Sequence, residues 1–324
     1  MSEKDNIQTL LNEKADIQSR IKVSNFDGSI EVKTLNNEKY IYVRKMEGGK
    51  HKSNYIDKYS DELYAMAVNQ SLEIRTLKKR LRQIEKELAK LGYSEIELSP
   101  RVQLNIDFAR ANVKTLIYDQ AVLEGVSTTF PQTETILENG IVNGVKASDV
   151  LKILNLKHAW EFIVDHDVVA SPSNYYLLSN IARLVNEGFY QNGGSIRNVP
   201  VSIGGSTYIP PIPLELSVKE DIDNIIHSDI EDIDKAIELT LYSMKTQIFI
   251  DGNKRAAIIF ANHFMISKGL GLLVVPENIV SEFKRLLIAY YEGKDEESIK
   301  IFLKEKCWRQ FWMNCLLNYS IGFK

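Results

Sequence analysis

The chain has 324 residues, of which 44% are hydrophobic and 26% charged, and its formal net charge at pH 7 is −3. This is the composition of an ordinary globular protein, and so small a net charge points to no electrostatic partner. No apolar run is long enough to span a membrane, and the N-terminus lacks the apolar core of a signal peptide. The two cysteines, Cys307 and Cys315, fit reduced core thiols, so we expect a cytoplasmic protein without membrane contact.

Residues 1–98 are expected to form an accessory α/β module. Apolar and polar residues alternate in segments that are separated by polar turns, which indicates a small β-meander. A helix precedes the meander, and a long helix follows it and ends at Gly92, as helices commonly end at glycine. The expected elements are a helix (7–21), three strands (29–33, 40–44 and 53–56) and the long helix (61–91).

The long helix of this module is rich in basic side chains. Acidic residues interleave with them, as they do where ion pairs form on a helix surface, so we favour a solvated helix face. A basic helix beside tyrosines can also contact nucleic acid, which stays open as a partner of the module. The basic residues are Arg75, Lys78, Lys79, Arg80, Arg82 and Lys86, and the acidic ones are Glu73, Glu85 and Glu87.

Residues 99–324 are expected to form a second, mainly helical domain. One helical pattern covers about residues 105–125, and another lies within 175–194. The segment of about 194–211 alternates up to Gly204-Gly205, a strong signal for a two-residue turn, and then returns to a pair of prolines. This pattern predicts a β-hairpin.

The C-terminal part of this domain, from Glu277 to Cys315, has a helical pattern. It carries three aromatic residues, Trp308, Phe311 and Trp312. We expect these side chains to close the core rather than to form a binding site.

The stretch that organises the second domain is Gln247–Arg255, which an apolar run from 256 to 265 follows. An Asp-Gly-Asn turn that opens a helix directs several backbone N–H groups and the positive end of the helix dipole at one point, where phosphate binds. Lys254 and Arg255 add cations, and Asp251 offers an oxygen ligand to a phosphate-bridging Mg²⁺. Alone, these residues equally fit a surface turn. The wholly apolar helix behind them must be buried, which favours a nucleoside triphosphate site.

The segment from Phe249 to Arg255 resembles the signature of Fic (Fido) proteins, His-Pro-Phe-x-Asp/Glu-Gly-Asn-Gly/Lys-Arg. The resemblance implies a helical Fic fold with a β-hairpin flap, ATP and Mg²⁺ as cofactors, and transfer of AMP from ATP to a hydroxyl side chain of a target protein. It also implies the site residues. Phe249, Asp251, Asn253 and Arg255 are implied in the catalytic centre, where Asp251 holds the metal. Gly252, Asn253 and Lys254 are implied along the phosphate cradle, and Arg255 on a terminal phosphate.

Three residues depart from the family pattern. Gln247 replaces the histidine that would be the general base, Ile248 replaces the proline, and Ile258 replaces the second arginine of the longer motif. A carboxamide does not titrate near neutral pH, so Gln247 can orient a hydroxyl group but cannot take its proton. None of the five histidines is an obvious replacement, and His263 is expected to be a partly buried helix residue.

The helix over about 105–125 ends in a second motif. In Fic proteins a Ser/Thr-x-x-x-Glu-Gly/Asn motif on an N-terminal helix blocks productive ATP binding, because its glutamate pairs with the second motif arginine. Glu124 and Gly125 resemble this motif, although Gln120 replaces the Ser/Thr. With isoleucine in place of that arginine, Glu124 would need Arg255 as its partner. The alternative is a helix that ends at Gly125 with an exposed glutamate.

The segment 194–211 resembles the Fic flap, commonly Gly-x-x-Arg…Val-x-Ile…Tyr-x-Pro-Pro. In the family this hairpin holds the target chain by edge-strand pairing, which implies Val201, Ile203 and Tyr208 as target-docking residues. The alternative is a hairpin that is merely packed. The sequence does not identify the target protein, and it leaves self-association open.

Three functions remain open. The leading hypothesis is a Fic-type adenylyltransferase whose base position is degraded, so that activity is weak or absent. The second is Doc-like transfer of phosphate, which Lys254 in place of the motif glycine favours slightly. The third is a catalytically silent module that binds nucleotide or a partner protein within a toxin-antitoxin or phage-defence system.

Overall fold

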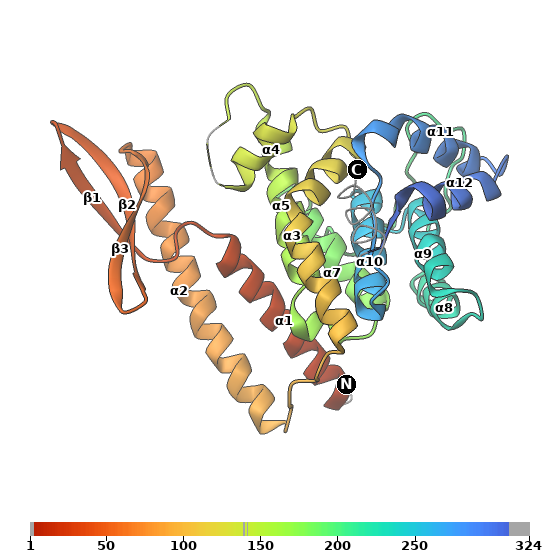
Figure 1. The fold of residues 1–324 in the computed structure, drawn as a ribbon, viewed down its shortest axis with the longest axis horizontal. Helices are drawn as coiled ribbons and strands as arrows, with labels where there is room; N and C mark the ends of the chain where they lie inside the picture. Colours follow the sequence, from red (N-terminus) through yellow and green to blue (C-terminus); the bar gives the residue numbers. More distant parts are fainter. Residues whose placement is uncertain (1–2, 139, 141, 311–324) are drawn as a thin grey trace, which may run out of the picture. The chain divides into compact units, whose positions relative to one another are not determined.

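The computed structural model describes residues 3–138, 140 and 142–310, and it is mainly helical, as predicted (Figure 1). The chain forms two compact units, residues 1–95 and 96–324. Every helix within the described ranges is too short or too polar to cross a lipid bilayer. The expectations for Phe311, Trp312 and Cys315 concern positions outside the described residues.

The first unit contains the predicted β-meander between two helices. Its elements are α1 (Glu3–Val23), β1 (Ser29–Leu35), β2 (Glu38–Glu47), β3 (Lys50–Lys58) and α2 (Asp61–Lys90). The strands pair antiparallel in the order β1-β2-β3. One face of the sheet is apolar, and its Ile41 and Val43 pack with Phe26 and with Ala67 of α2. A separate aliphatic cluster joins the two helices through Leu10, Leu11, Ile17, Ile84 and Leu88.

The second unit is a helical domain built around α10 (Asn253–Lys268). Thirteen of the sixteen residues of α10 are buried, because the helix contacts α3, α5, α7 and α9. The helices that precede α10 are α3 (Pro100–Leu123), α4 (Phe130–Leu137), α5 (Ala147–Ile163), α6 (His166–Val169), α7 (Tyr175–Val185), α8 (Glu215–His227) and α9 (Asp232–Thr246). Because α10 is held on several sides, its N-terminus is a fixed point in the domain.

The C-terminal part is less continuously helical than predicted. Its elements are β4 (Leu272–Leu273), η1 (Glu277–Ile279), α11 (Val280–Tyr291), α12 (Glu297–Phe302), the π-helical turn η2 (Leu303–Cys307) and β5 (Trp308–Arg309). The helical pattern stops at β5, which pairs antiparallel with β4. The indole Nε1 of Trp308 donates to the Leu270 carbonyl at 2.7 Å, which fixes this half-buried ring beside the strand pair.

The segment 194–211 differs from the predicted hairpin. The chain turns at Gly204 and Gly205, but its two sides do not form a strand pair within the described residues. Prolines offer a physical reason, because Pro200, Pro210 and Pro211 have no N–H to donate to a ladder. The guanidinium of Arg197 joins the two sides instead, by donating to the carbonyls of residues 199, 210 and 211.

Candidate functional site

The loop before α10 is held in shape by Asn253. The Asn253 Oδ1 accepts from the Phe249 N–H at 2.9 Å, and its Nδ2 donates to the Phe249 carbonyl at 2.8 Å. The same Nδ2 donates to Gln247 Oε1 at 3.1 Å. Phe249 is itself buried and forms a β-bridge with Ile196. One side chain therefore closes the loop across six residues, and the entry into the helix is rigid.

Gly252 is the N-cap of α10 and has a φ of 73°, in the left-handed region that glycine occupies without strain. A Cβ at this position would lie only 2.7 Å from Asn186 Oδ1, so close packing also requires glycine here. In the described chain no side chain caps this helix N-terminus. The first N–H groups of a helix have no intrahelical acceptor, and here these donors lie beside Lys254 and Asp251 in the chain.

Arg255 is buried, with 1% of its side chain exposed, and its guanidinium points inward. Its Nη1 donates to the Val185 carbonyl at 2.6 Å, and its Nη2 lies 3.4 Å from Asn186 Oδ1 and 3.3 Å from Asp251 Oδ2. Asn186 also donates from Nδ2 to the Asp251 carbonyl at 2.8 Å. Arg255 and Asn186 thus fix the Asp251 segment at the mouth of α10.

Glu124 lies at the end of α3, with its carboxylate between the two cations of the loop. Its Oε1 is 3.6 Å from Lys254 Nζ, and its Oε2 is 3.6 Å from Arg255 Nε. Only 12% of the Glu124 side chain is exposed, so the alternative of an exposed glutamate is wrong. Neither Glu124 Oε1 nor Arg255 Nε finds a hydrogen-bond partner among the described residues. The Glu124 carboxylate is therefore held by its attraction to the two cations. A ligand oxygen that accepts better hydrogen bonds from these cations can displace it.

Two further side chains hold this arrangement. Gln120, which replaces the motif Ser/Thr, donates from Nε2 to the Arg255 carbonyl at 2.9 Å and accepts from Trp160 Nε1 at 3.1 Å. Ile258 is buried and shares a small apolar cavity with Leu123 and Trp160. The position of the usual second arginine has thus become part of the core.

Comparison with known families identifies the domain that holds this loop. Residues 172–265 match the Fic/DOC family, and residues 3–65 match a domain of unknown function, DUF6788. Residues 172–265 of the chain are a Fic/DOC family domain. A comparison with curated proteins found no significant match.

Solved structures of Fic proteins share the fold at low sequence identity. Fic-1 (residues 134–508) from C. elegans is 17% identical with a TM-score of 0.50, and the match covers 75% of this chain and 74% of that one. A Fic domain containing signaling protein from Bacteroides thetaiotaomicron is 17% identical with a TM-score of 0.52, and the match covers 72% of this chain and 92% of that one. A Fic family protein from Desulfovibrio desulfuricans is 13% identical with a TM-score of 0.52, and the match covers 72% of this chain and 78% of that one.

Gln247 occupies the histidine position of the Fic motif in a constrained conformation. It ends α9 with a φ of 48°, and its backbone carbonyl accepts from Arg197 Nε at 2.5 Å. Its Nε2 donates to the Met244 carbonyl at 2.6 Å, and its Oε1 accepts from Asn253. Both polar atoms of the carboxamide are therefore engaged within the loop.

The segment 194–211 is held from two sides. Arg197 is buried, and this burial lowers the pKa of its guanidinium. At the turn, Glu292 Oε1 accepts from the Thr207 N–H at 3.0 Å; a hydrogen bond from Lys294 and this contact lower the pKa of Glu292 to about 2. The predicted docking residues Val201, Ile203 and Tyr208 are half-buried.

His263 is more buried than expected. It is fully enclosed, with Nδ1 2.9 Å from Ser173 Oγ and Nε2 2.8 Å from the Val168 carbonyl. Burial lowers the pKa of His263 to about 4. It is therefore a neutral core residue, and it does not fit the role of a catalytic base.

Proposed function

We propose that the Fic domain binds ATP with Mg²⁺ at the N-terminus of α10 and transfers AMP to a hydroxyl side chain of a target protein at a low rate. The observation that carries this proposal is the uncapped helix N-terminus at Gly252, flanked by Lys254 and Asp251. Lys254 is 34% and Asp251 47% exposed, so both can reach a ligand from the side of solvent. The residues present fit a triphosphate.

The parts of the loop would have separate tasks. The N–H groups from Gly252 to Lys254 and the Lys254 amine would hold phosphate oxygens, and Asp251 would hold Mg²⁺, which neutralises phosphate charge. Arg255 points at Asp251 and Glu124 in this structure, so its primary task would be to position Asp251. A direct grip on a terminal phosphate would require Glu124 to leave.

A low rate of AMP transfer follows from the glutamine at position 247. General base catalysis is worth about 100- to 10,000-fold, and a glutamine does not supply it. Positioning and electrostatics, which account for much of phosphoryl-type chemistry, remain available. We infer that Glu124 further restrains the site, because an incoming phosphate must take its place between Lys254 and Arg255.

A silent nucleotide-binding module is the second candidate. The hydrogen bonds of Gln247 favour it, because the carboxamide serves the loop rather than an incoming hydroxyl group. In this candidate the flap would bind a partner protein without modifying it. Both candidates share the phosphate site and differ only in turnover.

Labelling and calorimetry separate these functions. The full-length protein is incubated with Mg²⁺ and ATP labelled at the α- or the γ-phosphate, beside the Gln247→His variant. We expect α-label on protein, raised about 100- to 10,000-fold in the variant. Transfer of γ-label alone would instead support Doc-like chemistry. ATP binding by calorimetry without any labelling of the variant would leave the silent module, and absence of binding would refute the nucleotide site.

A further inference from the structure

The first unit carries a charge opposite to that of the whole chain. Residues 1–95 contain eighteen Lys and Arg against fifteen Asp and Glu, a net charge of +3, and residues 29–90, which span the meander and α2, hold fourteen and nine of these. The whole chain has a net charge of −3. Such an asymmetry places a basic surface on one module, which suits a polyanionic partner.

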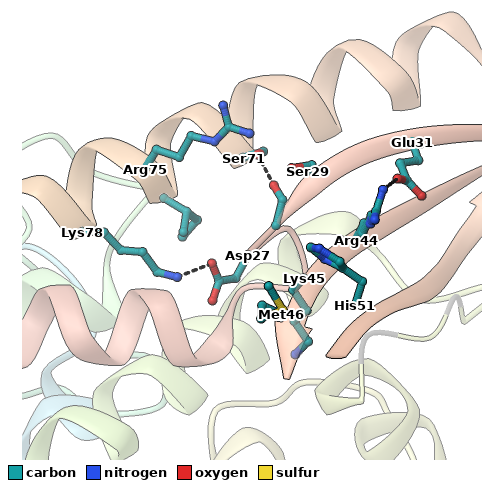
Figure 2. Close-up of a pocket in the computed structure, with 12 residues that line it drawn as sticks. Asp27, Ser29, Glu31, Arg44, Lys45, Met46, His51, Ser71, Arg75 and Lys78 are labelled. Carbon is teal, nitrogen blue, oxygen red and sulfur yellow. Dashed lines mark hydrogen bonds and ion pairs between the residues drawn. The ribbon is translucent and has the colours of Figure 1, made fainter. Parts of the chain in front are cut away.

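A groove concentrates this charge where α2 meets the sheet (Figure 2). Its volume is about 660 Å³, and cationic or titratable side chains line it from both sides. Arg75 and Lys78 come from α2, and Arg44, Lys45 and His51 come from β2 and β3. The exposed Arg75 forms no hydrogen bond or ion pair with any residue that the structure describes. Its guanidinium is available to a ligand.

The acidic residues of the groove are already paired. Asp27 accepts from Lys78 at 2.5 Å, and Glu31 lies 3.1 Å from Arg44 (Figure 2). These two pairs leave the charge of Arg75 in the groove at neutral pH. A phosphate would therefore meet attraction rather than repulsion from the groove.

Two of the residues that line the groove, Glu31 and Arg44, belong to the sheet face that carries aromatic rings. Arg44 lies two residues after Tyr42 on β2 and so on the same face. Glu31, which lines the groove, is the cross-strand partner of Tyr42, and Tyr42 is the partner of Tyr55. The Tyr55 ring packs against both Tyr40 and Tyr42, at centroid distances of 6.1 and 5.7 Å.

This tyrosine cluster is open to solvent on the side that the core does not use. Tyr55 is 55% exposed, whereas Ile41 and Val43 on the opposite face are buried. The ammonium of Lys33 lies 4.6 Å from the centre of the Tyr42 ring. Exposed rings beside cations are the combination that binds single strands, because bases stack on aromatic faces while basic side chains hold the phosphates.

We propose that the first unit binds single-stranded nucleic acid, with phosphates in the Arg75 groove and bases on the Tyr55 face. This surface is independent of the nucleotide site in the Fic domain. An acidic peptide would use the cations but not the rings, and the exposed rings favour the nucleic acid. The binding is expected to be tolerant of sequence, because every base has a face that can stack.

Fluorescence anisotropy of the full-length protein with a labelled oligothymidylate of about 20 nucleotides tests the proposal. Arg75→Ala with Lys78→Ala is expected to weaken binding about tenfold and to lower the salt slope by about 1.4. The matched control, Arg82→Ala with Lys86→Ala, removes the same charge from α2 outside the groove and is expected to change affinity less than twofold. An equal loss of affinity in the two double variants would show non-specific attraction and would refute the groove as the binding site.

A second pair of variants tests stacking without a change of charge. Tyr55→Leu is expected to weaken binding about 5- to 150-fold, and Tyr55→Phe should retain it. Circular dichroism checks that each variant is folded. Equal affinity of both variants and wild type would refute stacking on this face. Tighter binding of duplex than of the single strand, or equal displacement by polyglutamate, would overturn the proposed ligand.

Discussion

Glu124→Gln is expected to raise the affinity of the protein for ATP about tenfold. The substitution keeps the shape of the side chain and removes its charge from between Lys254 and Arg255. Two unit charges 3.6 Å apart attract with about 4 to 5 kcal/mol at an effective dielectric constant of about 20. A phosphate that enters at a similar distance from the carboxylate would meet a repulsion of the same gross size.

The net effect is smaller than this gross figure. Lys254 is 34% exposed, so solvent and salt screen the repulsion, and we expect about 1.4 kcal/mol to remain. The same substitution should lower the free energy of unfolding by about 1 to 3 kcal/mol, because Arg255 loses a charged partner in a buried site. Arg255 retains Val185, Asn186 and Asp251, which limits that loss.

Isothermal titration of ATP with Mg²⁺ into the full-length protein measures the change. The matched control is Glu138→Gln, which removes one carboxylate from the exposed pair with Lys114. The control should leave the dissociation constant unchanged. An equal or weaker affinity of folded Glu124→Gln would refute the inference that Glu124 competes with phosphate.

Three other properties can be predicted. His263 is held neutral, with a pKa of about 4 against about 6.5 in the unfolded chain, so the free energy of unfolding should fall by about 3 kcal/mol as the pH drops from 6.5 to 4. In urea unfolding, the free energy of the His263→Gln variant should depend less on pH over this window. Burial raises the pKa of Cys307 to about 12, so in a Cys315→Ser variant a thiol reagent should label the protein only after denaturation, and rapid labelling of the native form would contradict this. Arg197→Ala should lower the free energy of unfolding by about 2 to 4 kcal/mol, since several carbonyls, among them the buried one of Pro210, lose their donor; a loss below about 0.5 kcal/mol in chemical denaturation would contradict this role.

The parts of the fold that follow from local patterns could be predicted from the sequence. The meander of β1 to β3 and the long helix α2 have clear periodicity, and the structure has both. The turn at Gly252 and the apolar run of α10 predicted a buried helix with a glycine at its mouth. The contact between Glu124 and Arg255 was predicted from the loss of arginine at position 258.

Residues that act across long distances in the chain could not be predicted in this way. Asn186 holds the Asp251 carbonyl from 65 positions away, and no local signal marks it. Gln120 was seen only as a departure from a motif, whereas it holds the Arg255 carbonyl. The alternation of residues in segment 194–211 predicted a strand pair. It does not reveal that the Arg197 guanidinium donates to carbonyls of this segment.

Position 247 illustrates the same limit. The sequence shows that Gln247 cannot be a base, but only the structure shows that Met244 and Asn253 occupy its carboxamide. A side chain that holds the loop is not free to hold a hydroxyl group. The assignments of the predicted site residues to ATP, to Mg²⁺ and to the target remain proposals.

A crystal structure of the full-length protein with ATP and Mg²⁺ tests the central proposal most directly. We predict triphosphate density at the N–H groups of Gly252–Lys254, the metal on Asp251, and Glu124 moved away from Arg255. Density for ATP elsewhere, or an unchanged loop at saturating ATP, would contradict the account.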